Sequence, residues 1–359
     1  FDKKIIGLII GAVFIALIIG TIDIHKSIEA VKHLNFLYMA LMIPAYYSAF
    51  IFRSLRWHTI LSEKKEIKFS SLLDAIFRGW LANSIVPARG GELYRAHYFG
   101  KKEGISRVTI LASIVLERIF DGLILFLILF FLAAFVFSSK KFFGVAVAAG
   151  IIFIGTFSAL LLITKFYKNT FAKETDKHLL TNNDDQDKKE KAGFLILKIK
   201  ENNFIKKFLN EKICEILSKI FNKATSAIIS FMNGLEIFNS PVLILKTLFF
   251  TLLVWLCEGL SFFLIIKAFG YSIGILGSLF VLSIIAFISL IPGGPAGLGP
   301  VQWGYIISLK FFHISQETAF AVSIIGQIFS ILLICLGCLF FIITERLNLK
   351  EENLVNLEN

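Results

Sequence analysis

Long apolar segments, separated by clusters of charged residues, dominate the chain. A helix needs about 20 predominantly apolar residues to cross a bilayer. Runs with no charge, or with one, occupy Ile5–Ile22, Leu34–Phe52, Gly122–Ser139, Phe142–Thr164, Thr247–Ile266, Ala268–Leu309 and Thr318–Thr344. The run 268–309 is too long for one crossing. The pattern therefore predicts an all-α polytopic membrane protein with about seven or eight transmembrane helices.

The longest run is interrupted in its middle by Gly and Pro. The helical pattern is broken there by Pro292, Gly293, Gly294, Gly297 and Gly299. Gln302 lies at the start of the helix expected to follow. A Gly/Pro-interrupted hydrophobic segment in each half of a transporter is a sequence indicator of a binding site. We predict a re-entrant element near residues 284–309, with a flexible hairpin between two short spans as the alternative.

A second interruption lies in segment 79–95. It begins as an apolar helix, is broken by Pro87 and the pair Gly90–Gly91, and then becomes charged. Broken backbone at membrane depth persists only where it lines a cavity or is buried in protein. We predict a re-entrant element near 79–95 as well. The alternative is a surface loop with a local salt bridge.

The distribution of Lys and Arg near span ends predicts the organisation of the chain. Residues 1–164 form an N-terminal membrane half with an Arg-rich motif region, and we expect its first span to be retained. Residues 165–241 form a charged cytoplasmic loop with amphipathic helices between 194 and 238. Residues 242–346 form a C-terminal membrane half, followed by a short cytoplasmic tail, 347–359. Both termini are then cytoplasmic, in the cell (cytoplasmic or inner) membrane.

Composition supports the membrane assignment and excludes several classes of protein. Hydrophobic residues make up 56% of the 359 positions and charged residues 18%, with a mean hydropathy of +0.77. A soluble domain carries about 25% charged residues. Positive-inside topology and anionic headgroups explain the net charge of +11 more simply than nucleic acid does. We expect the protein to interact with the membrane and not with nucleic acid. The sequence does not indicate an oligomeric state.

Metal and catalytic chemistry have little support. Cys335 and Cys338 have CxxC spacing but stand alone in an apolar run, and structural zinc needs four ligands. The six histidines show no metal-binding spacing, and no phosphate-binding loop or Ser-His-Asp pattern occurs. We expect no metal, no cofactor and no enzymatic activity.

The arginines are concentrated in one region. The chain has eight Arg and 29 Lys, and seven of the arginines lie within residues 53–118. Arginine is favoured over lysine where its planar fork binds phosphate or carboxylate. Arg53 and Arg56 follow the apolar run 34–52, so a topological role with Trp57 as an interfacial anchor is the leading interpretation for them. In segment 78–95 we predict an anion site at Arg89, Glu92, Arg95, Asn83 and Arg78. We expect Glu92 to pair with Arg89 or Arg95.

Acidic residues near the membrane define a second set of candidates. Glu117 and Asp121 share a helix face, and Arg118 reaches Asp121 at i,i+3. Ionisable residues at this depth usually face the bundle interior and pair. We expect supporting ion pairs here, with Arg78 or Arg95 as partners. Glu258 is the lone acid of its span, which leaves two alternatives: a proton site or a partner for the arginines.

These motifs resemble the family named for the lysylphosphatidylglycerol synthase transmembrane region, also described as flippase-like domain proteins. The matching elements are Arg53-x-x-Arg56-Trp57, Asn83-x-x-x-Pro87-x-Arg89-x-Gly91-Glu92-x-x-Arg95, Glu117-Arg118-x-x-Asp121 and the segment from Pro292 to Gly299. The resemblance covers most of the chain and implies handling of an anionic lipid, phospholipid or polyprenyl-phosphate-linked, at Arg89, Glu92 and Arg95.

Two departures from the family pattern matter. The synthases carry a large soluble acyltransferase-type domain after the membrane region, whereas this sequence ends shortly after its last predicted span, so we expect no synthesis of lysyl-lipid. Members commonly have a glutamate after the glycine break, where this sequence has Gln302.

The sequence thus predicts a flippase-like protein that moves or binds an anionic phosphate-headgroup lipid. Two alternatives stay open. One is a proton-coupled small-molecule transporter that uses Glu258 and the Glu117/Asp121 face. The other is a non-transporting membrane scaffold that docks through the 165–241 loop.

Overall fold

The computed structural model describes residues 22–62, 66–86, 90–175 and 234–358, with a few positions before the first and last of these ranges. These residues form helices and no β-strand, which confirms the all-α prediction. The α-helices are α2 (Ile24–Lys32), α3 (Phe36–Leu61), α4 (Phe69–Ile85), α5 (Gly90–Glu103), α6 (Arg107–Phe131), α7 (Lys140–Thr175), α11 (Pro241–Ala268), α12 (Gly274–Ile288), α13 (Pro300–Lys310) and α14 (Gln316–Glu358).

Five helical segments among the described residues are long and apolar enough to cross a membrane. They are Phe36–Leu61, Arg107–Val136, Phe142–Lys165, Pro241–Ala268 and Gln316–Leu347. The shorter α12 and α13 divide the long apolar run, as its Gly/Pro break predicts. The predicted first span and most of the amphipathic part of the 165–241 loop lie outside the described residues.

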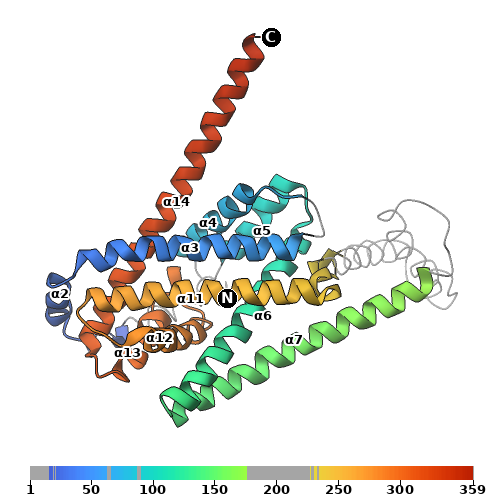
Figure 1. Cartoon of the computed structure of the whole chain (residues 1–359). Helices are drawn as coiled ribbons and strands as arrows, with labels where there is room; N and C mark the ends of the chain where they lie inside the picture. The colour runs from blue at the N-terminus through green and yellow to red at the C-terminus, as the bar shows by residue number, and fades with distance from the viewer. Residues whose placement is uncertain are drawn as a thin grey trace, which may run out of the picture.

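Helices α3 and α11 form the axis of the bundle and run side by side along most of their lengths (Figure 1). Each begins at a polar cap: the side chain of Asn35 accepts a hydrogen bond from the N–H of Leu37, and Ser240 caps the start of α11 just before Pro241. Helix α6 packs against α11 and α12, and α7 packs along α6 (Figure 1). Helix α14 contacts α13 and α4, and its C-terminal part projects away from the bundle (Figure 1).

Each predicted interruption lies between two short helices, the first between α4 and α5 and the second between α12 and α13. Helix α4 ends at Ile85, and α5 begins at Gly90 and packs back along α4. Helix α12 ends at Ile288, and a 3-10 turn at Pro295–Gly297 precedes α13. That turn packs directly against α4. Positive φ angles of 75° at Gly297 and 99° at Gly299 give the second break a path that residues with a Cβ rarely follow.

Helices α3 and α6 extend across charged residues that were expected to lie outside the spans. The expected span 34–52 continues as α3 to Leu61, and the span expected to begin at Gly122 begins as α6 at Arg107. Arg53 and Arg56 therefore lie within a helix and not in a loop after it, and both are buried. The charged residues Arg53 and Arg56 were expected to end the span. The helix continues through them because acidic side chains of neighbouring helices pair with both arginines.

Close backbone contact holds α4 against α5. A Cβ added at Gly91 would lie 2.2 Å from the carbonyl oxygen of Gly79 and 2.5 Å from the amide nitrogen of Asn83. The Gly91 N–H donates a 2.7 Å hydrogen bond to the Asn83 side-chain oxygen. Only glycine permits this crossing, which places the start of α5 beside the end of α4.

We predict that Gly91→Ala lowers the free energy of unfolding by about 1–3 kcal/mol, because the added methyl group must separate the two helices. Thermal unfolding in detergent measures the change. Gly155→Ala in α7 is the matched control, since nothing lies within 4 Å of a Cβ at that position. Equal stability of Gly91→Ala and the control would contradict the close crossing.

Candidate functional site

Eight ionisable side chains from four helices form ion pairs inside the bundle, and we call them together the charge ladder. Its members are Arg53 and Arg56 of α3, Glu92 and Arg95 of α5, Glu117, Arg118 and Asp121 of α6, and Glu258 of α11. Six of them are connected through shared partners, and the other two, Arg53 and Glu258, form a separate pair beside them. Four cations and four anions give a formal charge of 4 − 4 = 0. The set is therefore neutral without any ligand.

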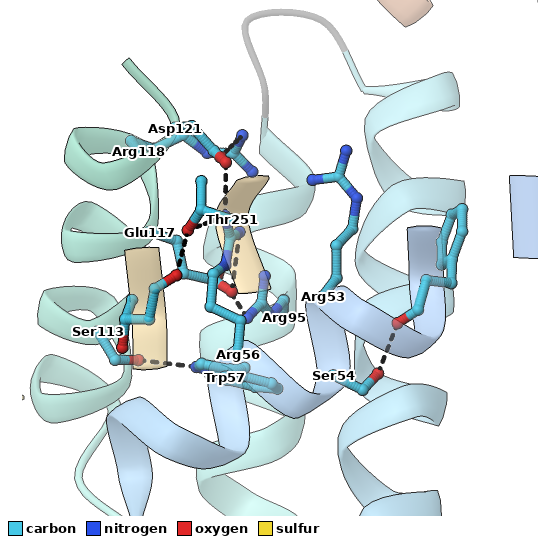
Figure 2. Close-up of polar contacts among 12 residues, drawn as sticks. Arg53, Ser54, Arg56, Trp57, Arg95, Ser113, Glu117, Arg118, Asp121 and Thr251 are labelled. Atoms are coloured by element: carbon cyan, nitrogen blue, oxygen red, sulfur yellow. Dashed lines mark hydrogen bonds and ion pairs between the residues drawn. The ribbon is translucent and has the colours of Figure 1, made fainter. Parts of the chain in front are cut away.

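Arg56 lies at the centre of the ladder and is 1% exposed. Its guanidinium is 2.5 Å from an Asp121 oxygen and 3.4 Å from a Glu117 oxygen (Figure 2). The indole N–H of Trp255 donates to the same Asp121 oxygen at 3.1 Å. Glu117 and Asp121 thus share one face of α6, as their spacing predicts, and they are held by an arginine from α3.

Arg95 occupies the next position in the ladder. Its guanidinium is 2.7 Å from Glu117 and lies 3.7 Å from the centre of the Trp57 ring. This confirms the predicted pairing between Arg95 and Glu117. The Trp57 indole donates to Ser113 and the side chain is fully buried. Trp57 is therefore a packing residue inside the bundle, and the expected role as an interfacial anchor is wrong.

Arg118 and Glu92 form the most accessible pair. Arg118 Nε lies 2.8 Å from Glu92, and an Nη lies 3.3 Å from Asp121, which confirms the predicted i,i+3 contact. The two side chains are 30% and 23% exposed. Among the described residues the partner of Glu92 is thus Arg118. The expected pairing with Arg95 is wrong because Arg95 turns inward toward Glu117, and the alternative partner, Arg89, lies outside the described residues.

Arg118 lies on the wall between two cavities. The first, about 350 Å³, separates the two helix breaks, and we call it the inter-break cavity. Its lining includes Asn83, Ser84, Val86, Glu92 and Arg118 from the first half, and Pro292, Gly293, Gly294, Ala296, Gly297, Gln327 and Ser330 from the second. The two interruptions of the apolar pattern therefore face each other across one cavity, whose wall carries several polar side chains.

The second cavity, about 300 Å³, is largely apolar. We call it the apolar cavity; its lining includes Leu125, Phe153, Phe262, Leu282, Ile285 and Phe287. Arg53, Arg118, Asp121 and Glu258 lie along one side of it. The two cavities share Trp80, Arg118, Ser289, Leu290 and Val301. An elongated ligand with one charged end can therefore contact both spaces while Arg118 holds that end.

Two glutamines fix the glycine-rich break. Gln302 accepts a 2.7 Å hydrogen bond from the Gly299 N–H and donates to Gln327 at 2.6 Å. Gln327 donates in turn to the carbonyl of Ala296 at 2.7 Å. A donor and an acceptor are both needed in this chain of bonds, and an amide supplies both. Gln302 thus holds the break and does not itself line the inter-break cavity.

The sequence of the whole membrane region matches a known family. The profile described as "Lysylphosphatidylglycerol synthase TM region" matches residues 4–337. The chain belongs to this family. The match includes both helix breaks and all eight residues of the charge ladder.

Curated relatives from archaea extend over most of the chain. A UPF0104 membrane protein of Methanocaldococcus jannaschii is 30% identical over 272 residues, which are 75% of this chain and 96% of that protein. A second from the same organism is 24% identical over 357 residues, 96% of each chain. One from Methanothermobacter thermautotrophicus is 21% identical over 334 residues, 91% of each chain. No solved structure shows a significant match.

The structure separates the predicted headgroup residues into three groups. Asn83 and Glu92 line the inter-break cavity. Arg95 is buried against Glu117, and Arg78 pairs with Asp74 and Glu345, so neither lines that cavity. Arg89 lies outside the described residues. Arg118, which was expected only to form supporting ion pairs, is the arginine that lines both cavities.

Several cavity residues carried no signal in the sequence. Gln327 and Ser330 lie in the apolar segment 318–344, and Tyr46 lies in 34–52, where each resembles an ordinary residue of a transmembrane helix. Trp80 of α4 lines both cavities. Polar residues recurring on one helix face, such as Gln327 and Ser330 at i,i+3, are the signal that could have identified this wall.

Arg78 belongs to a separate cluster around Asp74 at the junction of α4, α5 and α14. Asp74 accepts from Arg78 at 2.6 Å, from the Tyr98 hydroxyl at 2.6 Å and from Lys102 at 3.0 Å. Burial acts to raise the pKa of the Asp74 carboxyl, but the bonds from Tyr98, Arg78 and Lys102 hold that pKa below its ordinary value of 3.8. The ionised carboxylate therefore stabilises the packing of α5 on α4.

We predict that Asp74→Asn lowers the free energy of unfolding at neutral pH by about 2 kcal/mol, the scale of a charged hydrogen bond. Because the folded-state pKa is depressed, the contribution is complete above the unfolded value of 3.8 and is lost as the pH falls through the folded-state pKa. Thermal unfolding in detergent at neutral and acidic pH measures both effects. A stability difference that does not shrink in acid would contradict this account.

Proposed function

We propose that the chain binds an anionic lipid by its phosphate headgroup and moves that lipid across the cytoplasmic membrane. The observation that carries the proposal is the position of Arg118, on the wall shared by the inter-break cavity, which carries several polar side chains, and the more apolar second cavity. A lipid likewise joins a charged headgroup to an apolar chain. The family description, which names a lipid synthase, supports it.

Arg118 is suited to a phosphate because its planar fork donates paired hydrogen bonds to oxyanions. In the described structure that fork contacts Glu92 and Asp121. An incoming phosphate would compete with Glu92, whose side chain is partly exposed on the same cavity. Glu92 thus keeps the empty site neutral and is displaced when the headgroup binds.

The apolar cavity would hold the part of the lipid next to the headgroup. Its aromatic and aliphatic lining would cover the first part of a hydrocarbon chain, each buried methylene contributing about 0.8 kcal/mol. The remainder of the chain would stay in the bilayer. A phospholipid and a polyprenyl-phosphate-linked lipid share a phosphate joined to a long apolar chain, and this common chemistry defines the substrate class.

The glycine-rich break supplies the movable part of the pathway. Backbone of Gly293, Gly294 and Gly297 faces the inter-break cavity, and the glutamine bonds at Gln302 and Gln327 hold it closed. Exchange of these few hydrogen bonds for bonds to the headgroup would let a polar group pass between α4 and the break. The proposal requires translocation only, with no covalent step.

We predict that Arg118→Gln reduces the anionic lipid that copurifies with the gently extracted protein by about tenfold, whereas Glu92→Gln increases it. The first change removes a charged hydrogen bond worth about 1.5–3 kcal/mol, and the second removes the competing carboxylate. Mass spectrometry of retained lipids measures both changes and identifies whether the lipid is a phospholipid or polyprenyl-linked.

Arg107→Gln is the matched control, since Arg107 is an exposed arginine of the same helix, α6. It removes the same charge and should leave the retained lipid unchanged. Identical bulk lipids in the wild type, Arg118→Gln and Glu92→Gln would contradict the proposal.

Arg89 provides a second prediction, made from the sequence motif. We expect Arg89→Ala to lose the enriched phosphate-bearing lipid as Arg118→Gln does, because both remove a cation from the proposed headgroup site. The same mass spectrometry measures it. Retention of the enriched lipid by Arg89→Ala, with its loss in Arg118→Gln, would exclude Arg89 from the site and leave Arg118 as its cation.

A further inference from the structure

Arg53 is held differently from the other arginines of the charge ladder. Among the described residues its pair with Glu258 shares no member with the other ion pairs of the ladder. Its Nε, like those of Arg56, Arg95 and Arg118, has no hydrogen-bond partner in the described part of the chain. The rings of Trp80 and Trp255 lie 4.8 Å and 5.9 Å from the guanidinium carbon. In Figure 2 the Arg53 guanidinium stands apart from the cluster around Arg56. It lies on the apolar cavity with a donor to spare.

Glu258 also lines a small chamber. This space, about 40 Å³, is lined by Tyr46, Glu258, Ser261, Tyr305 and Ser330, together with Met42, Phe262, Ile265 and Gly326. A buried water needs about 10–15 Å³ and two or more polar partners, so the chamber accommodates water. Tyr46 and Ser330 also line the inter-break cavity. Polar groups therefore lead from that cavity to the carboxylate.

We propose that Glu258 binds a proton together with the anionic headgroup, so that anion binding and proton uptake are coupled. A hydronium ion in solution gives a proton to a Glu258 carboxylate oxygen and leaves as water, and the ion pair between Glu258 and Arg53 is replaced by one between Arg53 and the phosphate. The only covalent change is the exchange of one O–H bond of hydronium for the new O–H bond of Glu258. This inference rests on the proposed function and adds the coupling ion to it.

The charge balance of the ladder supports this coupling. The eight groups sum to zero, so an anion that enters alone leaves one uncompensated negative charge in a medium where such charges are costly. One proton restores neutrality. Arg53 and Arg118 both line the apolar cavity, so the freed Arg53 would place a second planar fork beside the first.

The other acids of the ladder are less suited to this role. Glu117 and Asp121 each contact two arginines. Neutralising Glu92 leaves Arg118 with Asp121 as a second partner. Arg53 has no second ion pair among the described residues, so protonation of Glu258 releases its whole charge.

The titratable groups that face Glu258 come from three further helices. They are Arg53 and Tyr46 of α3, Arg118 and Asp121 of α6, and Tyr305 of α13. The parts of α12 and α14 that line these spaces contribute apolar side chains, glycine and serine. Of these groups only Glu258 and Asp121 are carboxylates, and Asp121 is held by Arg56 as well.

Binding of dioctanoyl phosphatidylglycerol to the purified full chain tests the coupling. The phosphodiester of this probe keeps one negative charge between about pH 5.5 and about pH 8, so the ligand itself does not titrate there. We expect the Kd to fall by up to about tenfold for each unit decrease in pH, the limit for uptake of one proton. Titration heats in two buffers of different ionisation enthalpy should show proton uptake approaching one per lipid bound.

Glu258→Gln mimics the protonated acid, so it should bind the probe with a Kd that no longer depends on pH and with no proton uptake. Glu29→Gln is the matched control, because Glu29 is an exposed acid of α2, and it should behave as the wild type does. The buffer heats of the wild type test the coupling even if Glu258→Gln does not fold.

The outcomes separate this proposal from the proposed function. Binding by the wild type with a constant Kd and no proton uptake would overturn the coupling and leave lipid binding standing. Loss of pH dependence in Glu92→Gln, with its retention in Glu258→Gln, would also overturn the assignment to Glu258. Absence of binding by the wild type at every pH would overturn both proposals.

Discussion

The cost of placing charge in a low-dielectric interior governs this molecule. An isolated buried ion costs several kcal/mol even after relaxation, and removing one member of a buried pair costs about 3–5 kcal/mol. The structure meets this cost by placing four arginines among four carboxylates drawn from α3, α5, α6 and α11. Each pair between helices joins two of them, α3 with α11, α3 with α6 or α5 with α6, so the pairs together link all four helices.

The candidate site is a consequence of the same arrangement. Arg56 and Arg95 are enclosed by their partners, so they stabilise the bundle and are inaccessible to a ligand. Arg53 and Arg118 lie at the edge of the ladder, where the walls open into cavities. The two helix breaks provide the polar side of that opening. The candidate binding site thus lies where the accessible arginines of the charge ladder adjoin the two helix breaks.

The sequence predicted those features that are local. Gly and Pro at 292–300 and at 87–91 marked both breaks, and the spacing of Glu117, Arg118 and Asp121 placed two acids on one helix face. It failed where the partner lies far along the chain. The expected span 34–52 was ended at Arg53 because the local sequence shows a charge and cannot show Glu258, 205 positions later. Of the near neighbours expected for Glu92, Arg95 is not its partner, which among the described residues is Arg118 on another helix. Of the two partners expected for the acids of α6, Arg95 pairs with Glu117, whereas Arg78 pairs with Asp74 and Glu345.

The wide sequence separation of these partners has a consequence for biogenesis. Each arginine at the centre of a helix adds about 2.5–3.5 kcal/mol to the cost of membrane insertion, and α3 carries Arg53 and Arg56. During synthesis α3 emerges before Asp121, 65 positions later, and well before Glu258. Until α6 and α11 follow, α3 has no carboxylate to offset these charges and is best accommodated near the interface or beside the insertion machinery. Compensation of Arg56 therefore waits for α6, in the same half of the chain, and that of Arg53 waits for α11 in the C-terminal half.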